Sequence, residues 1–264
     1  MVNYPLDYAR YCSEITAETN RIAELVEGAD LSVRVPTCPA WDIAGLAVHI
    51  GQTHRWAAAT VRTRATGFVP HATVPDMTPA GRDAGSVAAW LRDSAARLAE
   101  DLGQAGADTK VWTGMPVENA SFWARRMTHE AVVHHADAAI ALGTDYSVAP
   151  EIAADAIDEW LFVLASPWGA NAAPRLAELR GPGTIALRAT DSAPEIGADW
   201  LIELGRDGFT WRRGVDESAT TTLRGPLTDV LQVFYRRQPA DSGRVEVLGD
   251  AKLLDEWLER ASFG

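Results

Sequence analysis

The stretch 125-RRMTHEAVVHHADA-138 places three of the chain's six histidines, a glutamate and an aspartate within fourteen residues of helical character. In an α-helix, residues four positions apart lie one above the other on the same face. Glu130 and His134 have this spacing, and Asp137 follows three residues later on nearly the same face. The pattern predicts that these three side chains lie together on a buried face of one helix.

The other histidines of this stretch do not fit a metal motif. The zinc-protease motif HExxH would need a histidine at position 133, which is Val133. His129 and His135 diverge from the face of Glu130 by about 100° each, in opposite directions. We therefore expect both to turn away from the site, and we expect His135 to be exposed.

A third donor is expected from another helix, which begins after Asp42. His49 shares a face with the apolar Leu46 and Trp56, so that face should pack inward. His54 is five residues later, about 140° around the helix, and is predicted to lie toward the solvated side. The sequence thus favours His49 over His54 as the third donor.

The resulting set of His49, Glu130 and His134 suits a divalent metal with one open coordination position. Zinc fits these ligand types first, and Fe(II), Ni and Mn stay open. Asp137 would then accept a hydrogen bond from a ligating histidine. The alternative is a Glu–His pair that forms a surface or interhelical hydrogen bond and holds no metal.

The remaining pattern predicts an α+β protein with two domains: an all-helical domain over residues 1–168 and a smaller α+β domain over residues 169–264. Apolar residues at helical spacing and Gly or Pro at the ends predict helices over 6–27, 42–64, 86–102, 121–142 and 150–165. Alternating segments follow at 184–190, 199–204, 208–213, 219–223 and 244–248, with helical stretches at 226–236 and 250–261.

Composition excludes several classes of function. The net charge is −12, the pI is about 4.9 and no basic run is present, so a nucleic-acid partner is not expected. The sequence shows neither an apolar run of membrane-spanning length nor a signal peptide, which predicts a cytoplasmic protein. The two cysteines form no disulfide framework. Cys12 is expected in the core, and Cys38 as a small packed residue in a turn, with a fourth metal ligand or a redox residue as alternatives.

Two stretches resemble the signatures of the mycothiol-dependent maleylpyruvate isomerase family: 36-PTCPAWDIAGLAVHIGQTHRWAA-58 and 122-FWARRMTHEAVVHHADA-138. The segments 223-LRGPLTDVLQVFYRRQ-238 and 245-VEVLGDAKLLDEWL-258 resemble its α+β C-terminal domain. The resemblance implies a DinB-like four-helix bundle that binds one divalent metal, usually zinc. The family's ligands fall on His49, Glu130 and His134, which the helix geometry also selects.

The resemblance further implies an enzyme that uses mycothiol, a low-molecular-weight thiol, on a small electrophilic substrate. A metal-activated thiolate would act as an S-transferase or as a cis–trans isomerase. Arg125 or Arg126 could clamp a substrate carboxylate, although Arg126 is also placed for a plain ion pair with Glu130. Arg236 and Arg237 could hold the thiol cofactor or an anionic substrate, or could simply complement the end of a helix.

Two other functions are compatible with the same bundle. One is a metal-dependent hydrolase or lyase that uses metal-bound water as its nucleophile or base. The other is a non-catalytic, metal-binding regulatory module. An open coordination position argues against the latter, because structural zinc sites are usually closed by four protein ligands. The sequence leaves the oligomeric state open.

Overall fold

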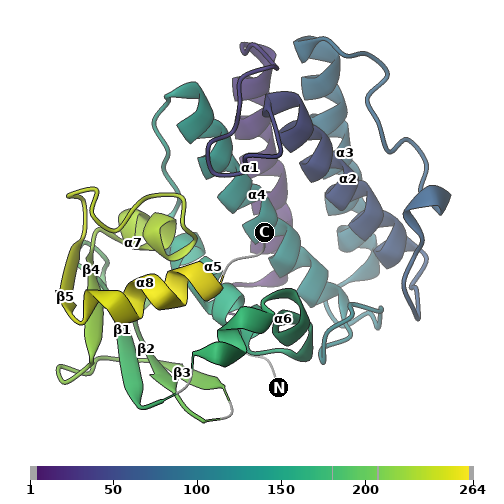
Figure 1. Ribbon diagram of the computed structural model, residues 1–264. Coiled ribbons are helices and arrows are strands. Elements are labelled where there is room, and N and C mark those ends of the chain that lie inside the picture. The colour runs from purple at the N-terminus through teal and green to yellow at the C-terminus, as the bar shows by residue number, and fades with distance from the viewer. Residues whose placement is uncertain (1–4, 180, 207, 262–264) are drawn as a thin grey trace. The chain divides into compact units, whose positions relative to one another are not determined.

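The computed structural model describes residues 5–179, 181–206 and 208–261 (Figure 1). Within them the chain forms eight α-helices, three short 3₁₀ helices and one five-stranded sheet. It divides into two compact units, one ending at Tyr146 and the other beginning at Ser147. No helix in the described ranges is long and apolar enough to cross a membrane.

The first unit is the predicted four-helix bundle. Each long helix begins at an Asp or Asn whose side chain accepts a hydrogen bond from a backbone N–H of the first turn, which satisfies a donor that the helix leaves unpaired. The helices are α1 (Tyr8–Glu27), α2 (Ile43–Arg62), α3 (Ala84–Ala105) and α4 (Ala120–Leu142), with a 3₁₀ turn η1 (His71–Thr73) in the loop between α2 and α3. Helix α4 ends at Gly143, whose φ of 66° suits glycine.

The second unit is the predicted α+β domain. Its sheet has the order β3-β2-β1-β4-β5, with β1 and β4 parallel and the other neighbouring pairs antiparallel. Trp200, Phe234 and Trp257 are among the largest buried side chains of its core. The elements are α5 (Pro150–Leu164), α6 (Pro167–Ala172), η2 (Pro174–Glu178), β1 (Gly183–Ala189), η3 (Pro194–Ile196), β2 (Asp199–Leu204), β3 (Phe209–Arg213), β4 (Thr221–Gly225), α7 (Leu227–Phe234), β5 (Glu246–Gly249) and α8 (Ala251–Arg260).

The boundary between the units differs from the one expected after residue 168. Helix α5 belongs to the second unit, because Asp158 accepts hydrogen bonds from Trp200 (Nε1–Oδ1, 2.7 Å) and Arg213 (Nη2–Oδ2, 2.8 Å) of the sheet. Tyr235, which follows α7, donates from Oη to the Ala156 carbonyl at 2.9 Å. Helical periodicity identifies α5 as a helix but does not say which core it joins. The short helix α6 is an element that the sequence did not predict.

Candidate metal centre

The structure brings His49 of α2 together with Glu130 and His134 of α4. One donor atom from each side chain can be chosen so that all three lie within 4.8 Å of one another. His134 Nε2 is 3.3 Å from Glu130 Oε2, and the two imidazole rings lie 5.0 Å apart at 83°. Two imidazoles and one carboxylate are ligands that zinc and related divalent cations accept, so this set fits a metal ion.

Asp137 fixes the orientation of His134. Its Oδ2 lies 2.8 Å from His134 Nδ1, and its side chain is completely buried. Because an ionised carboxylate only accepts, this contact keeps a proton on Nδ1 and directs Nε2 toward Glu130. Thr37 donates a hydrogen bond to the other oxygen of Asp137. The expected contact between Asp137 and His134 is therefore present.

A second group of possible donors shares His134 with the first. Cys38, His134 and Asp137 also offer donor atoms within 4.8 Å of one another, and Cys38 Sγ lies 3.6 Å from Asp137 Oδ2. In this group the carboxylate already accepts hydrogen bonds from His134 and Thr37. We therefore treat Asp137 as the support of His134 and the set containing His49 as the better metal site.

Arg126 and the two histidines set the charge of Glu130. Arg126 Nη2 is 2.8 Å from Glu130 Oε1, and both side chains are 20% exposed. Burial raises the pKa of Glu130, but Arg126, His134 and His49 outweigh it and hold that pKa well below its usual value. Glu130 is therefore a carboxylate at neutral pH, which is the form that can bind a cation.

The two histidines of the set differ in their surroundings. Burial lowers the pKa of His134, but hydrogen bonds with Asp137 and Glu130 outweigh it and raise that pKa to about 9. Burial, with His134 beside it, lowers the pKa of His49. His49 is also stacked on the Trp41 ring at 4.5 Å, and Trp41 meets His134 edge-on at 5.8 Å. The sequence analysis did not predict that Trp41 contacts both imidazoles, although Trp41 directly precedes the Asp42 cap.

Two predictions about the remaining histidines were wrong. His135 is not exposed but buried, with Nδ1 2.7 Å from Glu18 Oε2 of α1. His54 does not lie on the solvated side, because it is completely buried. Helix α4 contacts both α1 and α2, and α2 is also packed against α3, so each helix is covered on more than one face. His129 is buried as well and meets the Tyr11 ring edge-on at 6.3 Å.

The two arginines before Glu130 lie in different environments. Arg126 contacts Glu130 and is partly exposed, whereas Arg125 is only 4% exposed. Consecutive helical residues point about 100° apart, so the two guanidinium groups leave α4 on different faces. Of this pair, Arg126 is the one that the structure brings to His49, Glu130 and His134, the candidate ligands that we call the metal-binding set.

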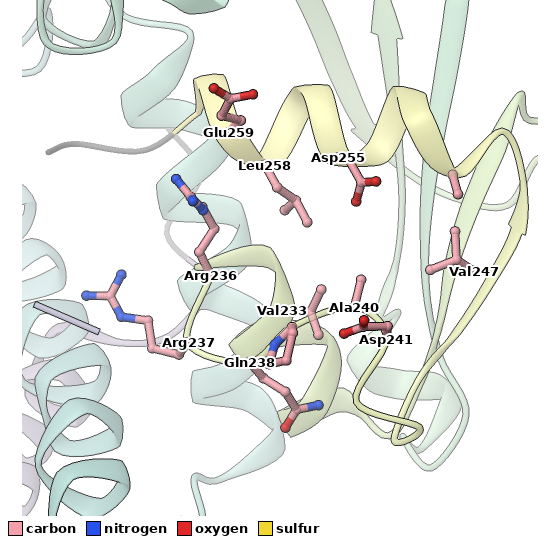
Figure 2. Close-up of a pocket in the computed structure, with 12 residues that line it drawn as sticks. Val233, Arg236, Arg237, Gln238, Ala240, Asp241, Val247, Asp255, Leu258 and Glu259 are labelled. Carbon is pink, nitrogen blue, oxygen red and sulfur yellow. The ribbon is translucent and has the colours of Figure 1, made fainter. Parts of the chain in front are cut away.

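Arg236 and Arg237 lie in the second unit, directly after α7. Arg236 has a φ of 59°, a conformation uncommon for a residue with a side chain, and Arg237 Nη1 donates to the Tyr235 carbonyl at 2.8 Å. Both line a pocket of about 680 Å³ whose other polar residues are Gln238, Asp241, Asp255 and Glu259. Figure 2 shows Arg236 extending toward Glu259 while the Arg237 guanidinium points away from Asp241.

Comparison with known families agrees with this architecture. Residues 12–139 match the mycothiol maleylpyruvate isomerase N-terminal domain, and residues 151–256 match the C-terminal domain of the same family. The chain belongs to the mycothiol maleylpyruvate isomerase family. All three residues of the metal-binding set fall in the first match, and the second match includes nearly all of α5.

Solved structures show the same family fold over nearly the whole chain. The crystal structure of the mycothiol-dependent maleylpyruvate isomerase aligns with a TM-score of 0.57 at 13% sequence identity, covering 93% of this chain and 95% of that one. A single-residue mutant of that isomerase aligns with a TM-score of 0.55 over the same shares, also at 13% identity. No curated protein matches the chain significantly in sequence.

Proposed function

We propose that this member of the family is a metal-dependent enzyme that uses mycothiol to act on a small electrophilic substrate. The observation that carries the proposal is the meeting of His49, Glu130 and His134, with Asp137 behind His134. Three protein donors and a supported histidine are typical of a catalytic zinc site with an exchangeable position. Zinc is therefore the metal we propose.

The chain's own residues would hold and tune that metal. Glu130 supplies a negative charge, and Arg126 binds the carboxylate oxygen opposite the one that faces His134. Asp137 keeps Nε2 of His134 directed at the site. A bound divalent cation lowers the pKa of a thiol, so that the thiolate is present at neutral pH.

Arginines are the proposed partners of anionic groups on the substrate and the thiol. Arg126 lies closest to the metal-binding set and is the first candidate to attract a substrate carboxylate, with Arg125 second. Arg236 and Arg237 are the candidates in the second unit for holding the thiol cofactor.

The same activated thiol has two possible reaction outcomes. Addition of the thiol to an activated double bond, rotation and loss of the thiol would give cis–trans isomerisation, whereas displacement of a leaving group would give S-transfer.

The decisive experiment measures metal and thiol binding on the same preparations. Elemental analysis of the purified protein should find about one zinc per chain, and His49→Ala should reduce it to background. His71→Ala, which changes a histidine outside the set, should keep the metal. Titration calorimetry should then show that mycothiol binds to the wild type and not to His49→Ala, with glutathione as the comparison thiol.

Each failure has its own meaning. A wild-type protein without metal would contradict the proposed site. A protein with metal that binds neither thiol would contradict the thiol-dependent function and favour a hydrolase or lyase that uses metal-bound water.

A further inference from the structure

Cys38 belongs to the second group of donors, formed by Cys38, His134 and Asp137, which we call the thiol set. One donor atom from each of these side chains lies within 4.8 Å of the other two. Asp137 Oδ2 is 2.8 Å from His134 Nδ1 and 3.6 Å from Cys38 Sγ. The thiol set therefore brings a sulfur, a nitrogen and an oxygen together around one side of the His134 ring.

The spacing of the thiol set is close to that of metal ligands. In a tetrahedral zinc site, the usual bond lengths place the carboxylate oxygen about 3.5 Å from a thiolate sulfur and about 3.3 Å from an imidazole nitrogen. The observed sulfur–oxygen distance is 3.6 Å, and the nitrogen–oxygen distance of 2.8 Å needs to open by about half an ångström. Thr37 donates to the other oxygen of Asp137, which holds the carboxylate while Oδ2 faces the sulfur and the imidazole.

The loop that carries Cys38 is held by its backbone and lies at the surface. The Cys38 N–H donates to the Val35 carbonyl at 3.1 Å, and the Trp41 N–H donates to the Cys38 carbonyl at 2.9 Å. Cys38 is partly exposed, and the adjacent Pro39 and Ala40 are exposed. A cation from solution therefore has access to a sulfur whose main chain is already in place.

The thiol set and the metal-binding set use opposite sides of the His134 ring. Nδ1 faces the thiol set, whereas Nε2 lies 3.3 Å from Glu130 Oε2 of the metal-binding set. A neutral imidazole has one protonated nitrogen and one nitrogen with a free lone pair. A metal bound to Nε2 leaves the proton on Nδ1, and a cation bound to Nδ1 leaves the proton on Nε2. His134 can therefore serve only one of the two sets at a time.

The two sets also favour different cations. The metal-binding set offers two imidazoles and a carboxylate, whereas the thiol set offers a thiolate, an imidazole and a carboxylate. Thiolate is the soft ligand among these, and soft ligands favour soft cations. A soft cation should thus prefer the thiol set even though His49, Glu130 and His134 form the better site for zinc.

We propose that the thiol set is a second metal site for a soft, thiophilic cation, and that its occupation displaces the metal of the metal-binding set. The cation replaces the thiol proton of Cys38 and the Nδ1 proton of His134, and both protons pass to water. Nε2 takes up one proton when the first metal leaves it. Asp137 changes from the support of His134 to a ligand. The displacement rests on the proposed function, because it requires a metal at the metal-binding set, whereas binding of the soft cation does not.

The test uses Cd²⁺ as the soft cation on the purified, zinc-loaded protein. Cadmium should produce the ultraviolet charge-transfer band of a thiolate–cadmium bond. Elemental analysis after gel filtration should show that zinc leaves as cadmium enters, so that the total metal per chain stays constant. Cys38→Ser, which keeps a hydroxyl group in place of the thiol, should give no band and should retain its zinc.

The matched control is Cys12→Ser. Cys12 is the other partly exposed cysteine of the first unit, and burial raises the pKa of its thiol to about 11. This variant should give the same band and the same loss of zinc as the wild type.

Four outcomes would overturn the inference. A band that persists in Cys38→Ser or disappears in Cys12→Ser would place cadmium elsewhere. Zinc release that persists in Cys38→Ser would mean that cadmium exchanges directly at the metal-binding set. A band without loss of zinc would mean that the two sets do not compete for His134. A wild type that holds no zinc would contradict the proposed function and the displacement with it, while the band would still decide whether the thiol set binds cadmium.

Discussion

The surroundings of His134 and of His54 shift the pKa of a buried histidine in opposite directions. His134 is 7% exposed and His54 is completely buried, so both lose nearly all contact with water. Burial lowers both pKa values, but hydrogen bonds with Asp137 and Glu130 raise that of His134 to about 9, while that of His54 falls to about 4. Neither ring nitrogen of His54 has a hydrogen-bond partner among the described residues. Burial disfavours the charged imidazolium of both residues, and the presence or absence of carboxylate partners decides whether the pKa rises or falls.

The largest expected effect is the loss of metal affinity in Asp137→Asn, which changes the carboxylate partner of His134. This change keeps the shape of the side chain but replaces the charged acceptor of His134 Nδ1 with a neutral amide. Loss of such a support of a metal ligand typically weakens metal binding by about 10- to 100-fold. Competition with a chelator of known zinc affinity measures the change.

Glu18→Gln is the matched control for Asp137→Asn. Glu18 is likewise completely buried and is bonded to Nδ1 of a histidine on α4, but that histidine is His135, which is outside the metal-binding set. Zinc affinity should remain at the wild-type value. Equal losses in the two variants would show that Asp137 acts on the fold rather than on His134.

The second effect is a loss of stability in acid that comes from His54. Its folded pKa of about 4 lies below the ordinary value of 6.5, so the unfolded chain binds the extra proton as pH falls through this window. The contribution is complete above pH 6.5 and is lost progressively toward pH 4. Between pH 7 and pH 5, the free energy of unfolding should fall by about 2 kcal/mol from this group alone.

Urea unfolding of wild type and His54→Leu, at both pH values and after metal removal, measures that loss. The leucine variant should lose about 2 kcal/mol less than the wild type over the same interval. Replacing an unpartnered buried polar group with an apolar one should cost little at pH 7. Parallel pH curves for the two proteins would mean that His54 finds a partner for its proton.

The smallest effect is expected from Arg126→Gln. The Arg126–Glu130 pair joins consecutive turns of α4, and both side chains are 20% exposed, so solvent weakens their attraction. The free energy of unfolding should fall by about 1 kcal/mol or less. Urea denaturation checks this value, and a loss of several kcal/mol would make Arg126 a structural residue rather than a candidate for binding a substrate carboxylate.

Much of the fold follows from local patterns in the chain. Apolar residues at helical spacing, with Gly or Pro at the ends, predict all four bundle helices to within a few residues, because amphipathicity and helix-ending residues act within one helix. Alternation likewise predicts the five strands. The partner of α5 could not be predicted in this way, because Asp158 meets Trp200 and Arg213 only after the sheet has formed.

The candidate site also combines features that local sequence patterns predict with features that depend on tertiary contacts. The spacing of Glu130, His134 and Asp137 within one helix is enough to place them on one face, and the structure brings His49 to them as predicted. The burial of His54 and His135 was predicted wrongly, because it depends on which faces the neighbouring helices cover. A single helical wheel shows where a side chain points but not which helix lies there.

The sequence by itself determined the helices, the strands and the grouping of donors along α4, since these depend on spacings of three and four residues. The tertiary structure alone decided the opposite pKa shifts of His54 and His134, the stacking of Trp41 on His49, and the meeting of Trp56 with Phe68 and His71. Those contacts join residues from separate helices and loops. Burial and the nearest charge set a histidine pKa, and both are created only when these segments pack.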